Sequence, residues 1–125
     1  RVTYFVAGVP AGCDHTGGQV GRIAGWPKFI ATGEQASPEI VAAVRYFDGV
    51  NFAALAKAPG FFTVGFIDTT CPPTSVYAAF NALRAEKGMF NDIPSGHTNS
   101  PAAGKAMREA ALNHFAAMRG VGGAR

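Results

Sequence analysis

The fold of this chain is decided by residues 60–73, which read GFFTVGFIDTTCPP. The first eight of these residues form an apolar run rich in aromatic and β-branched side chains, which is typical of a strand buried on both faces of a parallel sheet. Pro72 and Pro73 lack a backbone donor and have a fixed φ, so the strand ends before them and a helix can begin there. Between strand and helix stands Asp68, a carboxylate whose burial is costly unless it has a partner or a chemical role.

A histidine follows the next expected strand. Residues 87–94 (KGMFNDIP) predict a short strand, and His97 lies in the loop after it. One strand, one crossover helix and one strand fill the interval from residue 60 to this loop, as in a parallel βαβ unit. Parallel pairing would bring the loops of Asp68 and His97 to the same edge of the sheet, where ligands bind in such folds.

The rest of the chain alternates between strand and helix signals. Val2–Ala7 predicts a further strand with both faces buried, and the glycine-rich residues 8–33 predict a long loop. This alternation predicts an α/β fold with parallel strands and covering helices, in one partial domain spanning residues 1–125. Helices are expected from Ser37-Pro38-Glu39 onward, over Asp48–Leu55, from Pro72 or Pro73 to an end signal at Lys87 and Gly88, and from Ser100-Pro101 to Gly120. The last helix is expected to turn Met107, Ala111, Phe115 and Met118 inward and to be followed by a frayed tail.

The composition argues against several classes of function. Hydrophobic residues make up 48% of the chain and charged residues 15%, which is the balance of a domain with a sizeable core. The 11 lysines and arginines are scattered without a run, so nucleic-acid binding has little support. No stretch is long enough to predict a membrane span. Cys13 and Cys71 are too few to indicate a disulfide framework or a zinc site.

Several stretches resemble one enzyme family. They are residues 46–53 (YFDGVNFA), 57–59 (KAP), 65–81 (GFIDTTCPPTSVYAAFN) and 96–97 (GH). Together they resemble the C-terminal part of the acetyl xylan esterases, the cephalosporin-C deacetylase-like α/β-hydrolases. The Asp-x-x-Cys-Pro-Pro element is fairly specific to that family. Residues 9–14 and 25–27 also resemble its segment after the nucleophile helix, so the similarity extends to about Pro101.

The resemblance implies the C-terminal portion of a serine esterase that deacetylates carbohydrate or other small acetyl esters. In such an enzyme Asp68 would be the triad acid and His97 the base, with the carboxylate orienting the imidazole that takes the proton of a serine. The serine and its Gly-x-Ser-x-Gly elbow would precede position 1, so we expect activity only when a segment with the missing N-terminal part of the fold complements the chain. No cofactor or metal is implied. The implied partners are the acetyl ester, that N-terminal segment and a second copy in a homo-oligomer.

Plainer interpretations of the same residues remain open. Asp68 could cap the following turn through Thr70 or Cys71, and His97 could be an ordinary loop histidine. Peptide or polyester hydrolysis on the same fold is an alternative function, because fold and triad do not fix the substrate. A non-catalytic truncated domain is the alternative outside enzymes.

Two further features of the long loop invite functional interpretations. Cys13-Asp14-His15 contains three side chains that can bind a metal, but neighbouring residues point apart, so a structural loop is favoured. Trp26 could stack on a sugar, although the favoured role is that of an aromatic anchor between the loop and the core. Asp48 is expected to satisfy backbone groups at a helix junction.

Overall fold

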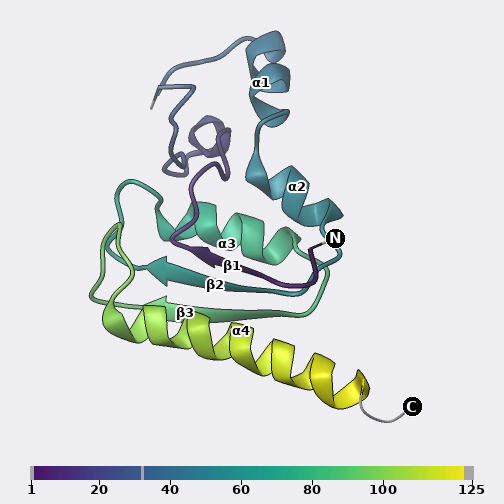
Figure 1. The fold of residues 1–125 in the computed structure, drawn as a ribbon. Helices are drawn as coiled ribbons and strands as arrows, with labels where there is room; N and C mark the ends of the chain where they lie inside the picture. The colour runs from purple at the N-terminus through teal and green to yellow at the C-terminus, as the bar shows by residue number, and fades with distance from the viewer. Residues whose placement is uncertain (1, 32, 123–125) are drawn as a thin grey trace.

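The computed structural model describes residues 2–31 and 33–122. Within them, three strands form one parallel sheet in the order β1-β2-β3, so the predicted parallel α/β arrangement is confirmed. Figure 1 shows the arrowheads of the strands pointing to one edge, where the loops of the expected site lie. The strands are β1 (Phe5–Gly8), β2 (Gly60–Gly65) and β3 (Lys87–Asp92).

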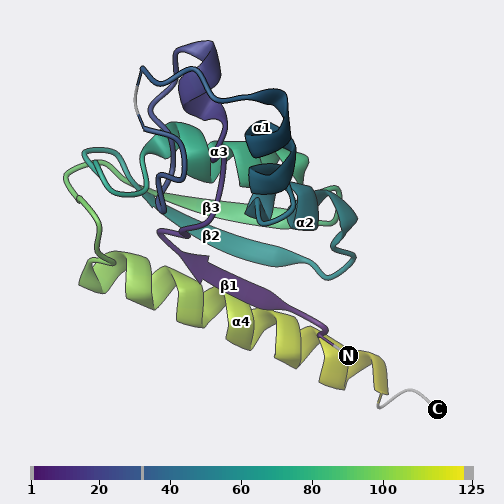
Figure 2. The same cartoon turned by 90° about the horizontal axis from the view of Figure 1, so that it is seen from above.

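Helices cover both faces of this sheet. Helix α3 packs on one face with α2 beside it, and α4 crosses the other face (Figure 2). No helix among the described residues is long and apolar enough to cross a membrane. The helices are α1 (Pro38–Arg45), α2 (Gly49–Leu55), α3 (Pro73–Ala82) and α4 (Pro101–Gly122), with a short 3-10 turn, η1 (Gly17–Val20), in the long loop.

The core lies between the central strand β2 and helix α3. Phe62 of β2 makes edge-to-face contacts with Phe5 and Phe80, at ring-centroid distances of 5.5 and 5.6 Å. Each fully buried aliphatic or aromatic side chain contributes about 1.5–3 kcal/mol to folding, so this cluster fixes β2 beneath α3. The buried members of the cluster are Cys13, Phe62, Val64, Val76, Ala79 and Leu83.

Two helix starts confirm the capping signals of the sequence. The Ser37 hydroxyl accepts a hydrogen bond from Ile40 N at 3.4 Å, with Pro38 at the first helical position. The Ser100 hydroxyl accepts from Ala103 N at 3.2 Å at the start of α4. Such caps satisfy backbone donors that have no partner within the helix, and each is typically worth about 1 kcal/mol.

The predicted end of the crossover helix is wrong. Helix α3 ends at Ala82, and Lys87 and Gly88 are the first residues of β3. The Lys87 amine nevertheless donates to the carbonyl oxygens of Phe80 and Leu83, at 2.8 and 2.6 Å. A cation is favourable at the carbonyl end of a helix, so the lysine stabilises the end of α3 from the neighbouring strand.

The expected burial of the two chain ends is also wrong. The first strand is Phe5–Gly8 and not Val2–Ala7, and Val6 is 46% exposed because β1 is the edge of the described sheet. Phe115 and Met118 are each 48% exposed instead of inward, because α4 extends beyond the sheet (Figure 1). Helix α4 continues to Gly122 and not only to Gly120, and the rest of the expected frayed tail lies outside the described residues.

The free edge of β1 predicts self-association of the isolated chain. Among the described strands, β1 pairs only with β2, which leaves backbone groups on its other side available to a second chain. We expect Val6→Lys to shift the chain toward monomer in sedimentation velocity, because a charge on an edge strand opposes strand pairing. Val20→Lys is the matched control, since Val20 is 65% exposed but lies in the 3-10 turn. Equal sedimentation of both variants would contradict pairing through β1.

Candidate active site

Asp68 anchors the turn between β2 and α3. Its side chain is fully buried, at 0% exposure. Oxygen Oδ1 accepts hydrogen bonds from Thr70 N and Cys71 N at 2.8 and 2.9 Å. These are the bonds of the capping interpretation, and they fix the carboxylate relative to the end of β2. They also leave the second oxygen free to face another group.

That second oxygen faces His97. Nδ1 of His97 lies 2.9 Å from Oδ2 of Asp68, while 43% of the histidine side chain remains exposed. An ionised carboxylate can only accept, so Nδ1 carries the hydrogen and Nε2 is left as the basic nitrogen of the ring. The two residues proposed from sequence are therefore neighbours, and capping and imidazole binding use different oxygens of one carboxylate.

The loop of His97 can approach β2 because residue 65 is glycine. A Cβ at Gly65 would lie 2.2 Å from the carbonyl oxygen of Gly96 and 2.6 Å from that of Ser95. The Ser95 carbonyl also accepts a hydrogen bond from Ile67 N at 3.1 Å, which ties the two loops together. Our sequence interpretation missed this role, although a glycine inside an apolar strand pattern is a signal of close backbone approach.

Asp92 holds the same loop from the end of β3. Its backbone carbonyl accepts from Ser95 N at 3.1 Å, and its Oδ2 accepts from Ser100 N at 3.3 Å. The hydrogen bond from the Ser100 side chain is the main reason that the pKa of Asp92 is lowered. A lowered pKa in the folded state means that this contribution to stability is present at neutral pH and is lost as the pH falls through that pKa.

Cys71 completes a cluster of three side chains that can bind metals. The ligand atoms of Asp68, Cys71 and His97 all lie within 4.8 Å of one another. Burial, and next the charge of Asp68, raise the pKa of the Cys71 thiol, while a backbone hydrogen bond from Trp26 lowers it. Metals bind the thiolate, which this environment disfavours, and both oxygens of Asp68 already accept hydrogen bonds. The geometry therefore fits a carboxylate–imidazole pair better than a metal site.

Residues 13–15, considered above as a possible metal site, make hydrogen bonds that hold the long loop in place. Arg22 donates to both carboxylate oxygens of Asp14 at 2.9 Å. The backbone N–H groups of Asp14 and His15 donate to Asp48, each at 2.9 Å, and so does Val50 N at the start of α2. The predicted role of Asp48 at the helix junction is thus confirmed, and it ties the long loop to α2.

Trp26 does not anchor the loop through its side chain, which corrects the favoured expectation. The residue is 54% exposed. Its backbone is fixed instead, because Gly12 N donates to the Trp26 carbonyl at 2.6 Å. Gly25 packs so closely that a Cβ there would lie 2.0 Å from the carbonyl oxygen of Cys13. Backbone contact, and not aromatic burial, holds this part of the loop.

A family model and a curated relative both match this chain to acetyl esterases. Residues 16–108 match the family described as Acetyl xylan esterase (AXE1). The chain is 39% identical over 87 residues to the acetyl esterase Axe7A of Xylanibacter ruminicola, an alignment that covers 70% of this chain and 20% of that protein. The chain therefore spans about a fifth of the length of this relative.

Solved structures show the same fold. The acetyl xylan esterase from Paenibacillus sp. R4 superposes with a TM-score of 0.72 at 24% identity, covering 87% of this chain and 37% of that one. Acetyl xylan esterase 1 from Thermoanaerobacterium sp. JW/SL YS485 gives a TM-score of 0.77 at 21% identity, covering 91% and 38%. The chain therefore belongs to the acetyl xylan esterase family and carries part of an α/β-hydrolase fold.

Proposed function

We propose that this chain supplies the acid and the base of a serine esterase that removes acetyl groups from carbohydrate or from other small acetyl esters. The observation that carries the proposal is the 2.9 Å contact between the buried Asp68 carboxylate and Nδ1 of the part-exposed His97. Family membership supports ester hydrolysis as the reaction class, and the similarity to an acetyl esterase supports acetyl as the acyl group that is removed.

In this reaction His97 acts as general base and Asp68 as its orienting partner. Nε2 of His97 takes the proton of a serine hydroxyl as the serine oxygen attacks the acetyl carbonyl carbon. The imidazolium then returns the proton to the sugar oxygen, which leaves as an alcohol and gives an acetyl-enzyme. Water, activated by the same nitrogen, releases acetate. The Asp68 carboxylate stabilises the imidazolium at each of these stages.

The nucleophile must come from a segment outside these 125 residues. Ser37, Ser75, Ser95 and Ser100 all lack the Gly-x-Ser-x-Gly setting of an α/β-hydrolase elbow. Ser75 is also buried, and its hydroxyl donates to the carbonyl oxygen of Pro72 at 2.8 Å. We therefore propose that residues 1–125 act as a partial domain, completed by a segment that contributes the serine and pairs with β1.

The test is hydrolysis of a chromogenic acetyl ester by the chain alone and after mixing with an N-terminal segment of the fold that contains the elbow. We expect activity only on mixing, and we expect His97→Ala to lower it by about 10² to 10⁴, or more when the triad acts as a unit. Lys105→Ala is the control, because it removes an exposed side chain from α4, outside the site.

Two outcomes would contradict the proposal. Hydrolysis by the mixture that survives His97→Ala would exclude this imidazole as the base. Hydrolysis by the unmixed chain, abolished by His97→Ala, would mean that one of its own residues is the nucleophile.

A further inference from the structure

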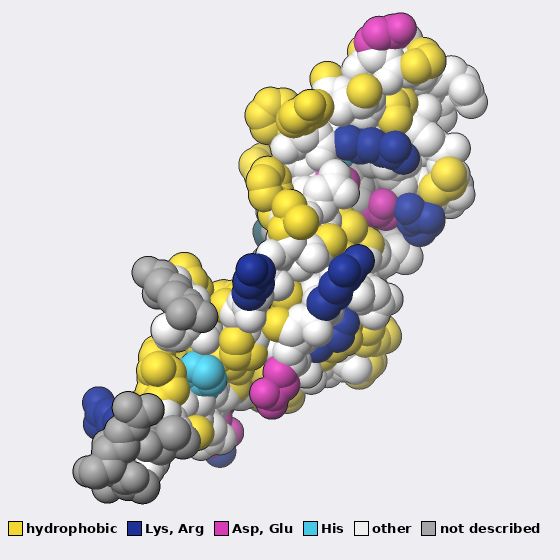
Figure 3. Space-filling model, turned by 90° about the vertical axis from the view of Figure 1, so that its right-hand side faces the viewer, with side chains coloured by type: hydrophobic (Ala, Val, Ile, Leu, Met, Phe, Trp, Pro, Cys, Tyr) yellow, Lys and Arg dark blue, Asp and Glu magenta, His cyan; other side chains and the backbone are white. Residues whose placement is uncertain are grey.

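A pocket lies at the opposite end of the sheet from Asp68 and His97. It has a volume of about 380 Å³ and opens at the amino ends of β2 and β3, against α4. The six residues of β2 separate it from the Asp68 turn, which at about 3.3 Å per residue is roughly 20 Å. Figure 3 faces this end of the molecule and shows histidine and acidic side chains bordering an apolar stretch of surface.

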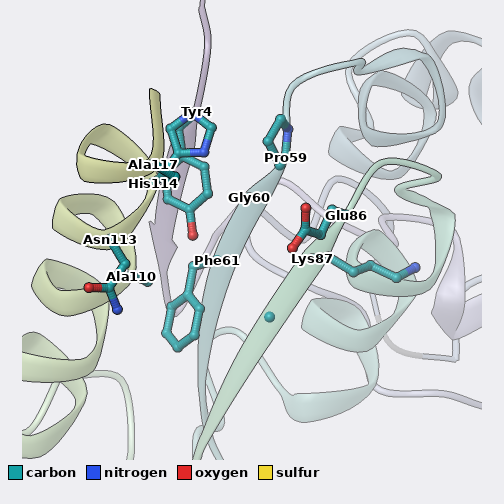
Figure 4. A pocket seen from close by; sticks show the side chains of 11 residues that line it. Tyr4, Pro59, Gly60, Phe61, Glu86, Lys87, Ala110, Asn113, His114 and Ala117 are labelled. Carbon is teal, nitrogen blue, oxygen red and sulfur yellow. The ribbon is translucent and has the colours of Figure 1, made fainter. Parts of the chain in front are cut away.

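Aromatic rings give the pocket flat apolar walls. Tyr4 and His114 are stacked, with ring centroids 4.5 Å apart and an interplanar angle of 20°. The ring of Phe61 lies across Gly88, where an added Cβ would be only 2.7 Å from it. Glycine at position 88 thus lets the phenyl ring lie on β3. Figure 4 shows Phe61 below the Tyr4–His114 stack on the same side of the pocket.

The polar groups of the pocket suit a ligand that has both hydrogen-bond donors and acceptors. In Figure 4 the Glu86 carboxylate turns toward the pocket, whereas the Lys87 amine turns away. That amine donates instead to carbonyl oxygens at the end of α3. Burial, and next the charge of Glu86, raise the pKa of Tyr4, so its hydroxyl stays protonated and can donate. Nε2 of His114 is buried and has no hydrogen-bond partner among the described residues.

We propose that this pocket binds a neutral sugar ring, at a subsite distinct from Asp68 and His97; the choice of carbohydrate as the ligand rests on the proposed function. A pyranose has apolar C–H faces for the aromatic walls, and its hydroxyl groups can donate to Glu86 and accept from Tyr4. An anionic ligand would be repelled by Glu86, and a quaternary ammonium group could neither donate nor accept a hydrogen bond. Combining apolar walls with a few placed polar groups is usual for small-ligand pockets. The binding does not depend on ester hydrolysis by the chain.

Saturation-transfer difference NMR with xylotriose tests this, because it observes the ligand and tolerates a self-paired chain. We expect saturable binding whose dissociation constant rises about fivefold in Glu86→Gln, because glutamine keeps an acceptor oxygen but loses the charge that strengthens the hydrogen bond. Tyr4→Phe, which keeps the ring and removes the hydroxyl, should raise the constant about fivefold. Glu109→Gln is the control, because it removes the same charge from the exposed surface of α4.

Each possible result of the NMR titrations either supports or overturns the proposal. Absence of saturable transfer in the unchanged chain, with native far-ultraviolet circular dichroism, would overturn the proposal. So would xylotriose binding that is unchanged by Glu86→Gln, or displacement of the sugar by tetramethylammonium. Binding that is weakened by Glu86→Gln and Tyr4→Phe, but not by Glu109→Gln, would support it even if the chain proved inactive on acetyl esters.

Discussion

Replacing Asp68 by asparagine is expected to lower kcat for acetyl ester hydrolysis by roughly 10⁴-fold in the complemented enzyme, with little loss of folded protein. The asparagine oxygen can still accept from Thr70 N and Cys71 N, so the turn is retained. The amide N–H₂ would then face Nδ1 of His97, which forces the hydrogen onto Nε2 and removes the base. Steady-state rates on a chromogenic acetyl ester, together with a denaturant unfolding curve, measure both effects.

Asp48→Asn is the control for this prediction. Asp48 is also buried and also accepts backbone hydrogen bonds, but it lies at the junction between α1 and α2 and not in the loops after β2 and β3. We expect this variant to lose stability without a comparable loss of kcat per folded molecule. If Asp68→Asn lowered kcat no more than Asp48→Asn does, the proposed orientation of His97 by Asp68 would be wrong.

Gly65→Ala is expected to damage both the fold and the activity. The added methyl group would overlap the carbonyl oxygens of Ser95 and Gly96, at 2.6 and 2.2 Å, and backbone cannot rotate away as a side chain can. We expect a loss of about 3 kcal/mol in the free energy of unfolding, at the upper end of overpacking costs. Because the displaced loop carries His97, kcat should fall further than the folded fraction does. Urea unfolding and rates per folded molecule separate the two losses.

Gly104→Ala is the matched control, because the same glycine-to-alanine change is expected to raise stability there and not to lower it. Gly104 lies inside α4, and nothing stands within 4 Å of the position of an added Cβ. Alanine is favoured over glycine in a helix by roughly 0.5–1 kcal/mol, so this variant should be slightly more stable. A Gly65→Ala protein as stable as the unchanged chain would show that the loop can move aside.

Local signals were enough to predict most elements of the fold. The serine caps at Ser37 and Ser100 start helices because they satisfy specific backbone donors, which depends only on neighbouring residues. The apolar run of β2 is buried on both faces because it is the central strand of the sheet. The pairing of Asp68 with His97 followed from the same reasoning, since parallel strands place their following loops at one edge.

The failed predictions concern residues whose surroundings are set by distant parts of the chain. Val6 stands in an apolar run typical of a buried strand, but β1 is the edge of the described sheet, and the local sequence does not reveal the position of a strand in its sheet. Phe115 continues the apolar spacing of α4 past the point where the sheet ends. Lys87 was predicted to end the crossover helix, yet it is the first residue of β3 and contacts the end of α3 only through its side chain. The close approach at Gly65 likewise depends on a loop 30 residues away in sequence.

The double use of the Asp68 carboxylate has an evolutionary consequence. In a descendant that had lost catalysis, selection for stability would still retain the aspartate. Without it, the N–H groups of Thr70 and Cys71 would have no hydrogen-bond partner in the turn before α3. The histidine, whose side chain is 43% exposed, would be free to change under relaxed selection. Among degenerate copies of such a gene, a retained aspartate would record shared ancestry, and a retained histidine would mark the copies that still work.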